Sequence, residues 1–567
     1  MFVATFTGAV SGLLAVLLKT AVHYLQELIR EIPISKFGYL FFPVIGLIVT
    51  VFIIRRFFKS EIERGIAMVL KAIARNAAFI PLKHTYVHAL TSSVTVGAGG
   101  SVGLEAPIVA TGSAIGSNIA RISDFTYRER TLLIGCGAAA GIAAVFNAPI
   151  AGVIFAIEIL LAEAVVSYFI PLIISSVAGA LCSKIILKES ILFNFTLKQN
   201  FDYHNVIFYI LLGILAGFVS LYYAYTFKSA EKRIQKWKMN AYLKALVGGL
   251  LLMIIYFAFE PLFGEGYDVV KQLANDSFRN DSSFVFSVFN ENTALILFTL
   301  FVLLLKPLAA AITIGSGGNG GNFAPSLFTG SFLGFFFSKL VNSTPWFKIP
   351  IGNFSLVGMA GVLSGVMYCP LTAVFLIAEI TNGYELVIPL MIVSSLSYFI
   401  VKHFEPYSME TKKLAMEGQI FTHKKELNIL TTIQLEDIIQ SDYPVVKNDK
   451  KLKDLVEILK FSEKNIFAII DKKERFTGII ELNDIKKQLF EPGLFEKVSV
   501  QQLMKKPSGI IYEGENMKLV MDKFDNSHTW YLPVLDKEKK FKGFISKTKL
   551  FSKYREILSS EGDLYEE

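Results

Sequence analysis

Residues 97–107 read GAGGSVGLEAP, and residues 315–325 read GSGGNGGNFAP. Six of the eleven aligned positions are identical, and both phrases close on Ala-Pro. A second pair follows at a similar distance, because residues 147–158 read NAPIAGVIFAIE and residues 368–379 read YCPLTAVFLIAE. The apolar part of the chain is therefore a duplication, and each half carries the same glycine-rich break. In membrane transporters, matching Gly/Pro-interrupted segments in two halves point to the binding site.

The composition indicates a polytopic membrane protein with enough length for a soluble domain. The chain has 567 residues, of which 53% are hydrophobic, and its mean hydropathy is +0.49. Apolar segments recur to about residue 405, and many are short or broken by glycine. Such segments fit tilted and half-spanning helices, because irregular backbone at membrane depth must be buried in protein or line a polar cavity. The net charge of +8 is assigned to cytoplasmic Lys and Arg rather than to nucleic-acid binding.

Several other classes of site receive no support from the sequence. Cys136, Cys182 and Cys369 lie in apolar surroundings without metal-ligand spacing, so we expect neither a disulfide framework nor a metal site. We find no nucleophile–base pair and no phosphate loop, and we therefore do not expect an enzyme. The apolar residues 8–18 lack a cleavage site, and this favours a retained membrane segment over a signal peptide.

From Glu405 onward the chain is charged and has the character of a soluble domain. Residues 465–484 resemble residues 530–549, and each copy has a β-type apolar run, an Asp-Lys turn, a second short strand and a helix start. A short strand and an amphipathic helix precede each copy, at 443–460 and 509–526. This order predicts two tandem α/β modules.

Together these motifs resemble the CLC family of chloride channels and chloride/proton exchangers, and the tail resembles a pair of CBS domains. The resemblance implies an all-α polytopic membrane protein with tilted and broken helices, plus a cytoplasmic α/β CBS pair. It also implies a homodimer in the lipid bilayer that transports chloride or another small anion. The expected boundaries are a membrane domain at 1–405 with inverted repeats at about 1–200 and 201–405, a linker at 406–432, and CBS domains at 433–495 and 496–560.

Glu105 is the glutamate inside the first glycine-rich phrase. Glycine-rich turns expose N–H groups, and helix N-termini attract anions, so two converging breaks would form an anion site made of dipoles. An ionisable residue in an apolar membrane segment is a functional hypothesis by default, and the alternative is a surface glutamate at a helix end. Glu105 resembles the family's gating glutamate, whose carboxylate competes with chloride, and its protonation would link pH to permeation.

The remaining anion ligands are also implied by the resemblance. Gly103 and Leu104 precede Glu105 and are assigned to the same site. The backbone amides of Asn322 and Phe323 match those that coordinate the central anion in the family. Tyr407 matches a tyrosine that adds its hydroxyl, and the alternative is an interfacial belt tyrosine.

Three positions depart from the family pattern. The inner-gate motif falls on residues 63–67, ERGIA, where Arg64 replaces a serine that would bind the anion. We interpret Arg64 as an electrostatic funnel rather than a tight ligand. Leu104 replaces the usual basic residue, which makes the outer vestibule less positive. Ile159 replaces the inner glutamate that exchangers commonly carry, and isoleucine cannot relay a proton.

The Ile159 substitution favours a passive, glutamate-gated chloride channel, with a chloride/proton antiporter as the alternative. A receptor-like protein with a vestigial pore is disfavoured by the intact Glu105 and both glycine-rich breaks. A fluoride exporter is disfavoured because Pro107 follows Glu105 in the usual way. Glu158 and Glu379, at matching places in the two halves, are interpreted as structural carboxylates that accept hydrogen bonds.

The tail raises the question of an adenine nucleotide, which CBS pairs often bind. The usual signature combines a hydroxyl residue with a later Asp that grips ribose. The first module has Asp484 without the hydroxyl residue, and the second has Ser546 without the Asp. Each copy is half a site, so a dimerising, gate-stabilising tail is the favoured alternative.

Overall fold

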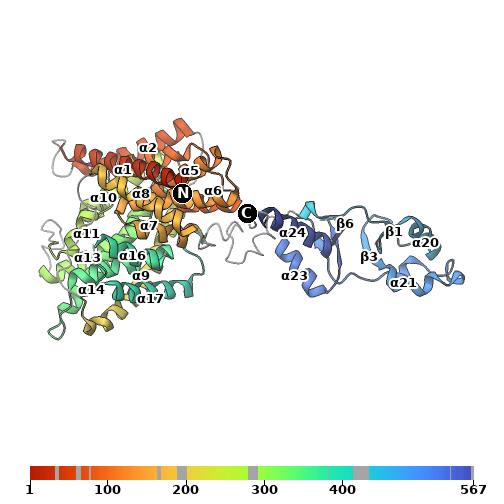
Figure 1. The fold of residues 1–567 in the computed structure, drawn as a ribbon. Helices are drawn as coiled ribbons and strands as arrows, with labels where there is room; N and C mark the ends of the chain where they lie inside the picture. Colours follow the sequence, from red (N-terminus) through yellow and green to blue (C-terminus); the bar gives the residue numbers. More distant parts are fainter. Residues whose placement is uncertain are drawn as a thin grey trace. The chain divides into compact units, whose positions relative to one another are not determined.

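A computed structural model describes residues 1–31, 38–58, 65–75, 78–161, 168–187, 201–278, 291–381, 383–412, 433, 435–536 and 538–562. The chain divides into two compact units, Met1–Ile420 and Phe421–Glu567. Figure 1 shows that helices make up the first unit, whereas the second unit also contains strands. The two units are described separately.

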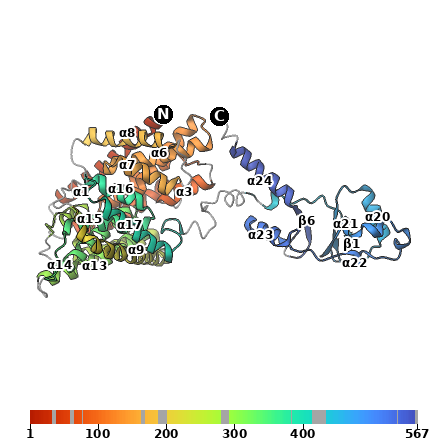
Figure 2. The same cartoon turned by 60° about the horizontal axis from the view of Figure 1, so that its bottom comes forward.

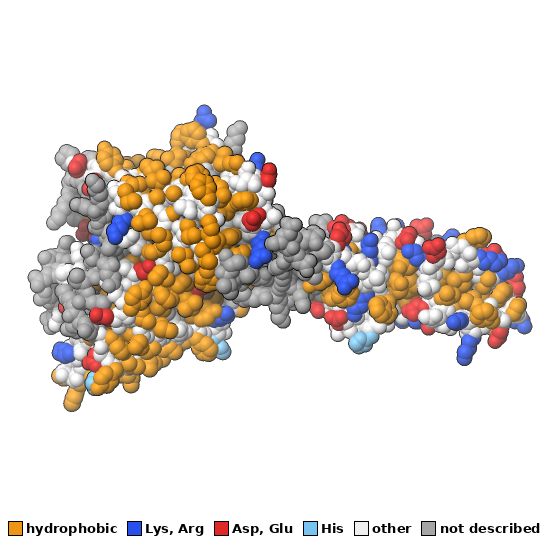
Figure 3. All heavy atoms as spheres, viewed as in Figure 1, with side chains coloured by type: hydrophobic (Ala, Val, Ile, Leu, Met, Phe, Trp, Pro, Cys, Tyr) orange, Lys and Arg blue, Asp and Glu red, His pale blue; other side chains and the backbone are white. Residues whose placement is uncertain are grey.

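The first unit is all-α, as the sequence predicts. Among the described residues, nine helical segments are long and apolar enough to cross a membrane. Figure 3 shows hydrophobic side chains spread over its visible face, while charged side chains are dense on the second unit. The main helices are α1 (Phe2–Glu31), α2 (Phe42–Phe58), α3 (Gly65–Arg75), α4 (His84–Gly97), α5 (Glu105–Ile122), α6 (Tyr127–Phe146), α7 (Pro149–Phe155), α8 (Phe169–Leu187), α9 (Val206–Gln235), α10 (Ala241–Ala258), α11 (Tyr267–Ala274), α13 (Glu291–Gly315), α14 (Phe323–Asn342), α15 (Ile351–Met367), α16 (Pro370–Ile380) and α17 (Val387–Phe404).

The duplication seen in the sequence is repeated in the backbone. Helix α6 ends at Asn147, which is left-handed with φ 52°, and Pro149 then starts α7. Helix α15 ends in the same way at Tyr368, with φ 61°, and Pro370 starts α16. Proline suits the first turn of a helix because its missing N–H would have no intrahelical partner there. The two halves thus share their turns as well as their motifs.

Glycine lets the corresponding helix pairs approach closely. A Cβ on Gly137 of α6 would collide with the carbonyl oxygen of Gly112 on α5. A Cβ on Gly330 of α14 would collide with the carbonyl oxygen of Gly358 on α15. Small residues at such crossings are typical of membrane helices, whose association depends on close packing rather than on the hydrophobic effect.

Basic residues identify the inner end of the bundle. Arg55 and Arg56 lie in the last turn of α2, and Lys232 and Arg233 lie in the last turn of α9. The Arg55 guanidinium also lies 5.9 Å from the ring of Tyr242, at the start of α10. Because cytoplasmic segments are enriched in Lys and Arg, this end faces the cytoplasm.

Helix α17 ends on the same inner side. Figures 1 and 2 both show α17 beside α9, and Gly213 and Gly217 of α9 pack against Leu396 and Ile400 of α17. Gly213 packs on Leu396 and Gly217 packs on Ile400, so residue numbers increase in the same direction along both helices. The two helices are therefore parallel. The segment after Phe404 therefore starts at the inner end of the bundle.

The opposite end of the bundle is the outer end. Helices α2 and α10 are antiparallel, because Gly249 of α10 packs on Val44 near the start of α2, whereas Tyr242 lies beside Arg55. The residues that follow α10 therefore lie at the outer end. The Tyr39 hydroxyl there donates to Glu260, at 2.9 Å.

The second unit contains two modules of the same design, as the sequence predicts. In each module a parallel strand pair is followed by an antiparallel pair, and each antiparallel pair has an irregularity near its end. The strands are β1 (Val445–Lys447), β2 (Ile466–Ile470), β3 (Phe476–Glu481), β4 (Ile511–Tyr512), β5 (Tyr531–Leu535) and β6 (Phe541–Ser546), and the main helices are α20 (Leu452–Phe461), α21 (Leu482–Leu489), α23 (Met517–Ser527) and α24 (Lys547–Gly562).

The two modules exchange their flanking segments. Gln440, which precedes the first module, pairs with Phe544 of β6, and Lys505 pairs with Ile479 of β3. Residues 433–438 contribute Ile433, Leu435 and Ile438 to the core of the second module.

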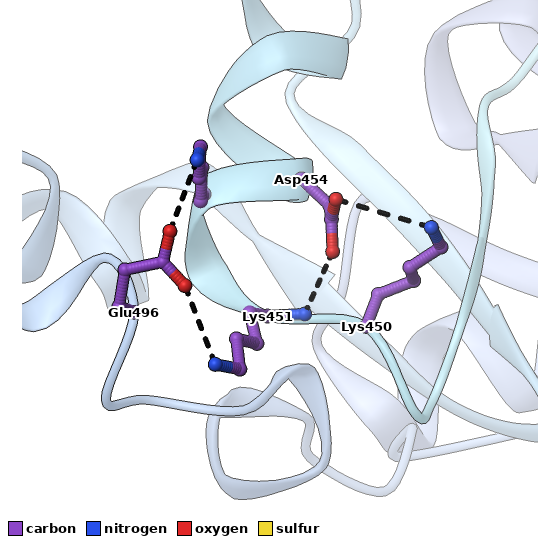
Figure 4. A network of polar contacts seen from close by, with 5 residues as sticks. Lys450, Lys451, Asp454 and Glu496 are labelled. Atoms are coloured by element: carbon purple, nitrogen blue, oxygen red, sulfur yellow. Dashed lines mark hydrogen bonds and ion pairs between the residues drawn. The ribbon is translucent and has the colours of Figure 1, made fainter.

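The segment between the modules is also tied to the start of the first one. Figure 4 shows Glu496 beside Lys451, and Asp454 between the Lys451 backbone and the Lys450 side chain. The Glu496 carboxylate lies 3.3 Å from Lys451 Nζ, and the Lys451 backbone N–H donates to Asp454 at 3.1 Å. Because the flanking segments cross, neither sheet is completed by one continuous stretch of chain.

Candidate anion-binding site

The two glycine-rich phrases meet. The Gly103 N–H donates to the Gly321 carbonyl at 2.9 Å, and the Gly321 N–H donates back to Gly103 at 2.9 Å. A Cβ on Gly103 would lie 2.7 Å from the Cβ of Ala324, and a Cβ on Gly321 would lie 2.6 Å from that of Ala106. Only glycine fits this junction. Two residues beyond each glycine, α5 and α14 begin, so two helix N-termini converge.

The two helices approach this junction from opposite sides of the membrane. Helix α5 ends near Arg121, and Arg128 and Arg130 follow in α6, which indicates the inner side. Helix α14 ends near Lys339, whose ammonium lies 3.0 Å from Asp276 beyond α11 on the outer side. Each N-terminus carries partial positive charge and unpaired N–H groups. Their convergence creates an anion-attracting point inside the bundle, where the sequence predicts it.

Glu105 occupies this point. Its side chain is 1% exposed, and the Tyr267 hydroxyl donates a short hydrogen bond to its Oε1 atom. The Oε2 atom makes no hydrogen bond among the described residues. The Oε2 atom lies over Gly103, because a Cβ atom added to Gly103 would collide with it. The same added Cβ atom would lie 3.1 Å from the Ala324 nitrogen. The carboxylate thus stands beside the N-terminus of α14, where an anion would otherwise be attracted.

On the outer side, a second carboxylate uses the N–H group next to Glu105. Glu265 Oε1 accepts from the Leu104 N–H at 3.1 Å. Lys306, which is fully buried, donates to the Gly264 carbonyl at 2.9 Å and lies 4.5 Å from the ring of Phe328. Sequence reasoning missed Glu265, Tyr267 and Lys306. The signal for Lys306 is present, since it is a lone cation after a long apolar run.

On the inner side, Asn322 links two further polar groups. The Tyr223 hydroxyl, fully buried, donates to Asn322 Oδ1 at 3.1 Å, and Asn322 Nδ2 donates to Glu410 Oε1 at 3.3 Å. Phe323 packs its ring against Phe146, with 5.7 Å between the centroids. The α14 N-terminus therefore has an apolar wall and an inner polar side.

Tyr407 is not brought to the site. Its side chain is 38% exposed, and no hydrogen bond or ring contact of the described residues joins it to Asn322. A turn after α17 gives the inward position to Glu410 instead, so a role for Tyr407 as an anion ligand remains a prediction. Arg64 lies outside the described residues. Ile159 lies half-buried in the π-helical turn Ala156–Leu160, against the apolar core.

Glu158 and Glu379 cap helices of the opposite half. Glu379 accepts from the N–H groups of Ile150 and Ala151 at the start of α7, at 3.0 and 2.8 Å. Glu158 accepts from Leu371 and Thr372 at the start of α16, at 3.1 and 2.8 Å. These reciprocal caps supply the donors that a structural interpretation of both carboxylates requires.

Asp484 and Ser546 each interact with other residues of the second unit. Asp484 Oδ2 is 2.6 Å from Lys505 Nζ, and Glu481 lies 3.1 Å from the same ammonium. Ser546 Oγ donates to Gln440 Oε1 at 3.1 Å. Both partners come from the exchanged segments, so a nucleotide would have to compete with them.

Comparisons with known proteins agree with this architecture. A family model described as voltage gated chloride channel matches residues 45–402, and a CBS domain model matches residues 435–491. The first match covers more than half of the chain, and the chain therefore belongs to the CLC family, whose members transport anions. It is an integral, multi-pass membrane protein, and its CBS unit lies outside the membrane region.

Individual relatives refine the picture. An uncharacterized protein of Methanocaldococcus jannaschii is 28% identical over 408 residues, 70% of this chain and 92% of that protein. The H+/Cl− exchange transporter ClcA of Yersinia pestis is 26% identical over 430 residues, 71% of this chain and 84% of that protein.

Solved structures show the same fold. A slow cyanobacterial Cl−/H+ antiporter has a TM-score of 0.62 at 21% identity, covering 74% of this chain and 97% of its own. A eukaryotic CLC transporter has a TM-score of 0.61 at 19% identity, covering 96% of this chain and 97% of its own. The predicted fold, a broken-helix membrane domain followed by a CBS unit, is confirmed.

Proposed function

We propose that this protein is a chloride/proton antiporter in which Glu105 serves both ions. The substitution of Ile159 favours a passive channel when the sequence is taken alone. The named relatives support the alternative, because ClcA of Yersinia pestis and the cyanobacterial neighbour are both described as exchangers of chloride and protons. The observation that carries the proposal is the buried Glu105 carboxylate at the N-terminus of α14.

Competition between a carboxylate and an anion couples the two ions. The ionised Glu105 places negative charge beside the same N–H groups that would bind chloride, and so excludes it. A proton removes this charge, and the neutral side chain no longer competes. Chloride then enters from either side, and the return of the carboxylate requires that the proton leave. One proton cycle is therefore tied to the movement of chloride.

The rest of the site supplies dipoles rather than full charge. Backbone N–H groups near Phe323 and Ala324 can replace part of the hydration shell of chloride without holding it tightly. This favours transport, since a strongly held ion leaves slowly. The hydrogen bond from Tyr267 holds Glu105 in the blocking position between cycles.

Two further properties are proposed from the resemblance to the family. The protein forms a homodimer with one anion pathway in each subunit. Its CBS unit stabilises the membrane domain. Adenine nucleotide binding at Asp484 or Ser546 remains a prediction, and fluorescence titration of the purified protein with a labelled nucleotide would test it.

The proposal is tested by transport in liposomes. Chloride efflux and external pH are recorded together on the purified protein, with the voltage set by a potassium ionophore. We expect a chloride gradient to drive protons uphill in a fixed ratio to chloride. Chloride efflux without proton movement would contradict the proposal and would favour the channel.

A further inference from the structure

The inner side of the site contains a carboxylate that the family resemblance does not assign. Glu410 Oε1 accepts from Asn322 Nδ2 at 3.3 Å, and Asn322 directly precedes the first residue of α14. Its Oε2 atom lies 3.7 Å from the position of a Cβ on Gly65, the first residue of α3. Glu410 therefore lies between the start of α3 and the start of α14, although it is 88 residues distant from Asn322 in sequence.

The segment that contains Glu410 is held in place at several points. The Lys412 N–H donates to the Ser408 carbonyl at 2.9 Å, which closes a turn around Glu410. The Tyr368 hydroxyl, at the turn before α16, donates to the Glu405 carbonyl at 2.6 Å. Lys412 also forms an ion pair with the Glu405 carboxylate at 2.7 Å. The position of Glu410 is thus a consequence of how the chain leaves α17.

Glu410 is placed on the proton-accessible side of the pathway. The side chain is half-buried, so it touches both the protein interior and solvent. The segment begins at the end of α17, which is the inner end of the bundle. Among the described residues, the Tyr223 phenol of α9 interacts with Glu410, and the Glu405–Lys412 ion pair lies in the same segment as Glu410.

The two carboxylates lie on either side of the α14 N-terminus. Glu105 Oε2 lies beside the Ala324 nitrogen from the outer side, and Glu410 contacts Asn322 from the inner side. Asn322 and Ala324 are two residues apart, a span of at most roughly 7 Å. Because Glu410 contacts the Asn322 side chain rather than the backbone, a proton passing between the two carboxylates would be carried by water molecules along the α14 N-terminus.

We propose that Glu410 is the inner proton-transfer residue of this chain and performs the role that Ile159 cannot perform. This proposal rests on the proposed antiport function. In the outward step, the O–H bond of protonated Glu410 breaks, water in the pathway carries the proton, and a new O–H bond forms on Glu105. The Glu410 carboxylate left behind is protonated again from the inner solution. The inward step runs in reverse.

The proposal also explains why the chain tolerates isoleucine at position 159. The half-buried Ile159 packs on the apolar core, so a carboxylate there would need its own polar partners. Glu410 already has them in Asn322 and, through Asn322, in Tyr223. Proton transfer requires an acid or base positioned within hydrogen-bond reach of the path. It does not require that this group come from a particular position in the sequence.

The test is the liposome assay on wild type, Glu410→Gln and Glu410→Asp, with Glu231→Gln as the control. Glu231 lies near the inner end of α9 and pairs with Lys228 at 3.4 Å. In Glu410→Gln we expect chloride efflux to persist, while protons moved per chloride fall about tenfold or more, as expected for loss of a positioned acid–base group. Glu410→Asp should restore part of the proton movement, and Glu231→Gln should behave as wild type.

The outcomes distinguish the two proposals. If wild type moves no protons uphill, antiport itself fails, and the role of Glu410 fails with it. If wild type couples and Glu410→Gln keeps the wild-type ratio of protons to chloride, only the role of Glu410 is overturned. Loss of both fluxes in Glu410→Gln, without recovery in Glu410→Asp, would assign Glu410 a structural role and would also overturn the proposal.

Discussion

The two glycine-rich turns share a backbone but differ in the residue that follows. Gly103 and Gly321 pair with each other, and each is two residues before a helix. The first helix opens with Glu105 and the second with Phe323. A duplicated scaffold therefore supplies two anion-attracting helix ends, and one copy has acquired a titratable side chain that can occupy the space between them. In the proposed function, the shared backbone supplies the N–H groups that bind chloride, and Glu105 supplies the titratable group that competes with chloride for them.

Replacing Glu105, the residue by which the two turns differ, should have the largest effect on transport. In Glu105→Gln both helix starts would carry neutral residues, so the pathway would lose its internal competitor. We expect proton movement to fall by about a hundredfold or more, with chloride efflux that no longer depends on pH. Combined chloride and pH recording in liposomes measures both, and Glu260→Gln on the outer surface serves as the control. Wild-type pH dependence in Glu105→Gln would rule out the gating role.

Substitutions at the paired glycines Gly103 and Gly321 should distinguish effects on stability from effects on gating. Gly103→Ala and Gly321→Ala should each cost about 1–3 kcal/mol of stability through overpacking. Only the Cβ at position 103 would collide with the Glu105 carboxylate, whereas that at position 321 would press on Ala106. We expect thermal unfolding in detergent to shift in both, but chloride efflux at neutral pH to rise only in Gly103→Ala. Equal effects on efflux would show that the junction controls transport without Glu105.

Tyr267→Phe should change the pH dependence of chloride efflux by a smaller amount. The substitution removes the hydroxyl that donates to Glu105, and a hydrogen bond to a charged group contributes about 1.5–3 kcal/mol. The ionised, blocking form would be less favoured. The pH at which chloride efflux is half-maximal should therefore rise by about one to two units. An unchanged pH profile would show that Tyr267 does not position Glu105.

The reciprocal caps should show the smallest effect. Glu158→Gln and Glu379→Gln each weaken the hydrogen bonds to a helix start, at a cost of about 1 kcal/mol. Both variants should unfold at slightly lower temperature and transport normally, because the caps lie in equivalent places in the two halves. Loss of proton movement in Glu158→Gln alone would place Glu158 on the proton path.

The duplication made much of the site predictable. The repeated phrase located Glu105, Asn322 and Phe323, and the helix starts do converge there. The inner and outer partners could not be predicted, because they come from distant parts of the chain. Tyr223 lies within a long apolar helix and looks like any buried aromatic residue. Glu410 lies in a segment whose charges are typical of an exposed linker.

The CBS unit shows the same limit. Its strand and helix order follows from local patterns of apolar residues, and these are visible in the sequence. The exchange of flanking segments does not follow from them. Nothing local to Gln440 indicates that it pairs with Phe544 of the second module rather than with the strands that follow it. Contacts between distant segments depend on the packed structure, and one sequence does not reveal them.

The measurement that tests the central claim most directly is chloride binding as a function of pH. Calorimetric titration of the purified protein would be performed at acidic and neutral pH on wild type and Glu105→Gln. If the Glu105 carboxylate competes with chloride at the α14 N-terminus, wild type should bind chloride more tightly at acidic pH. Glu105→Gln should bind it tightly at both. Equal affinity of wild type and the variant at neutral pH would contradict the account.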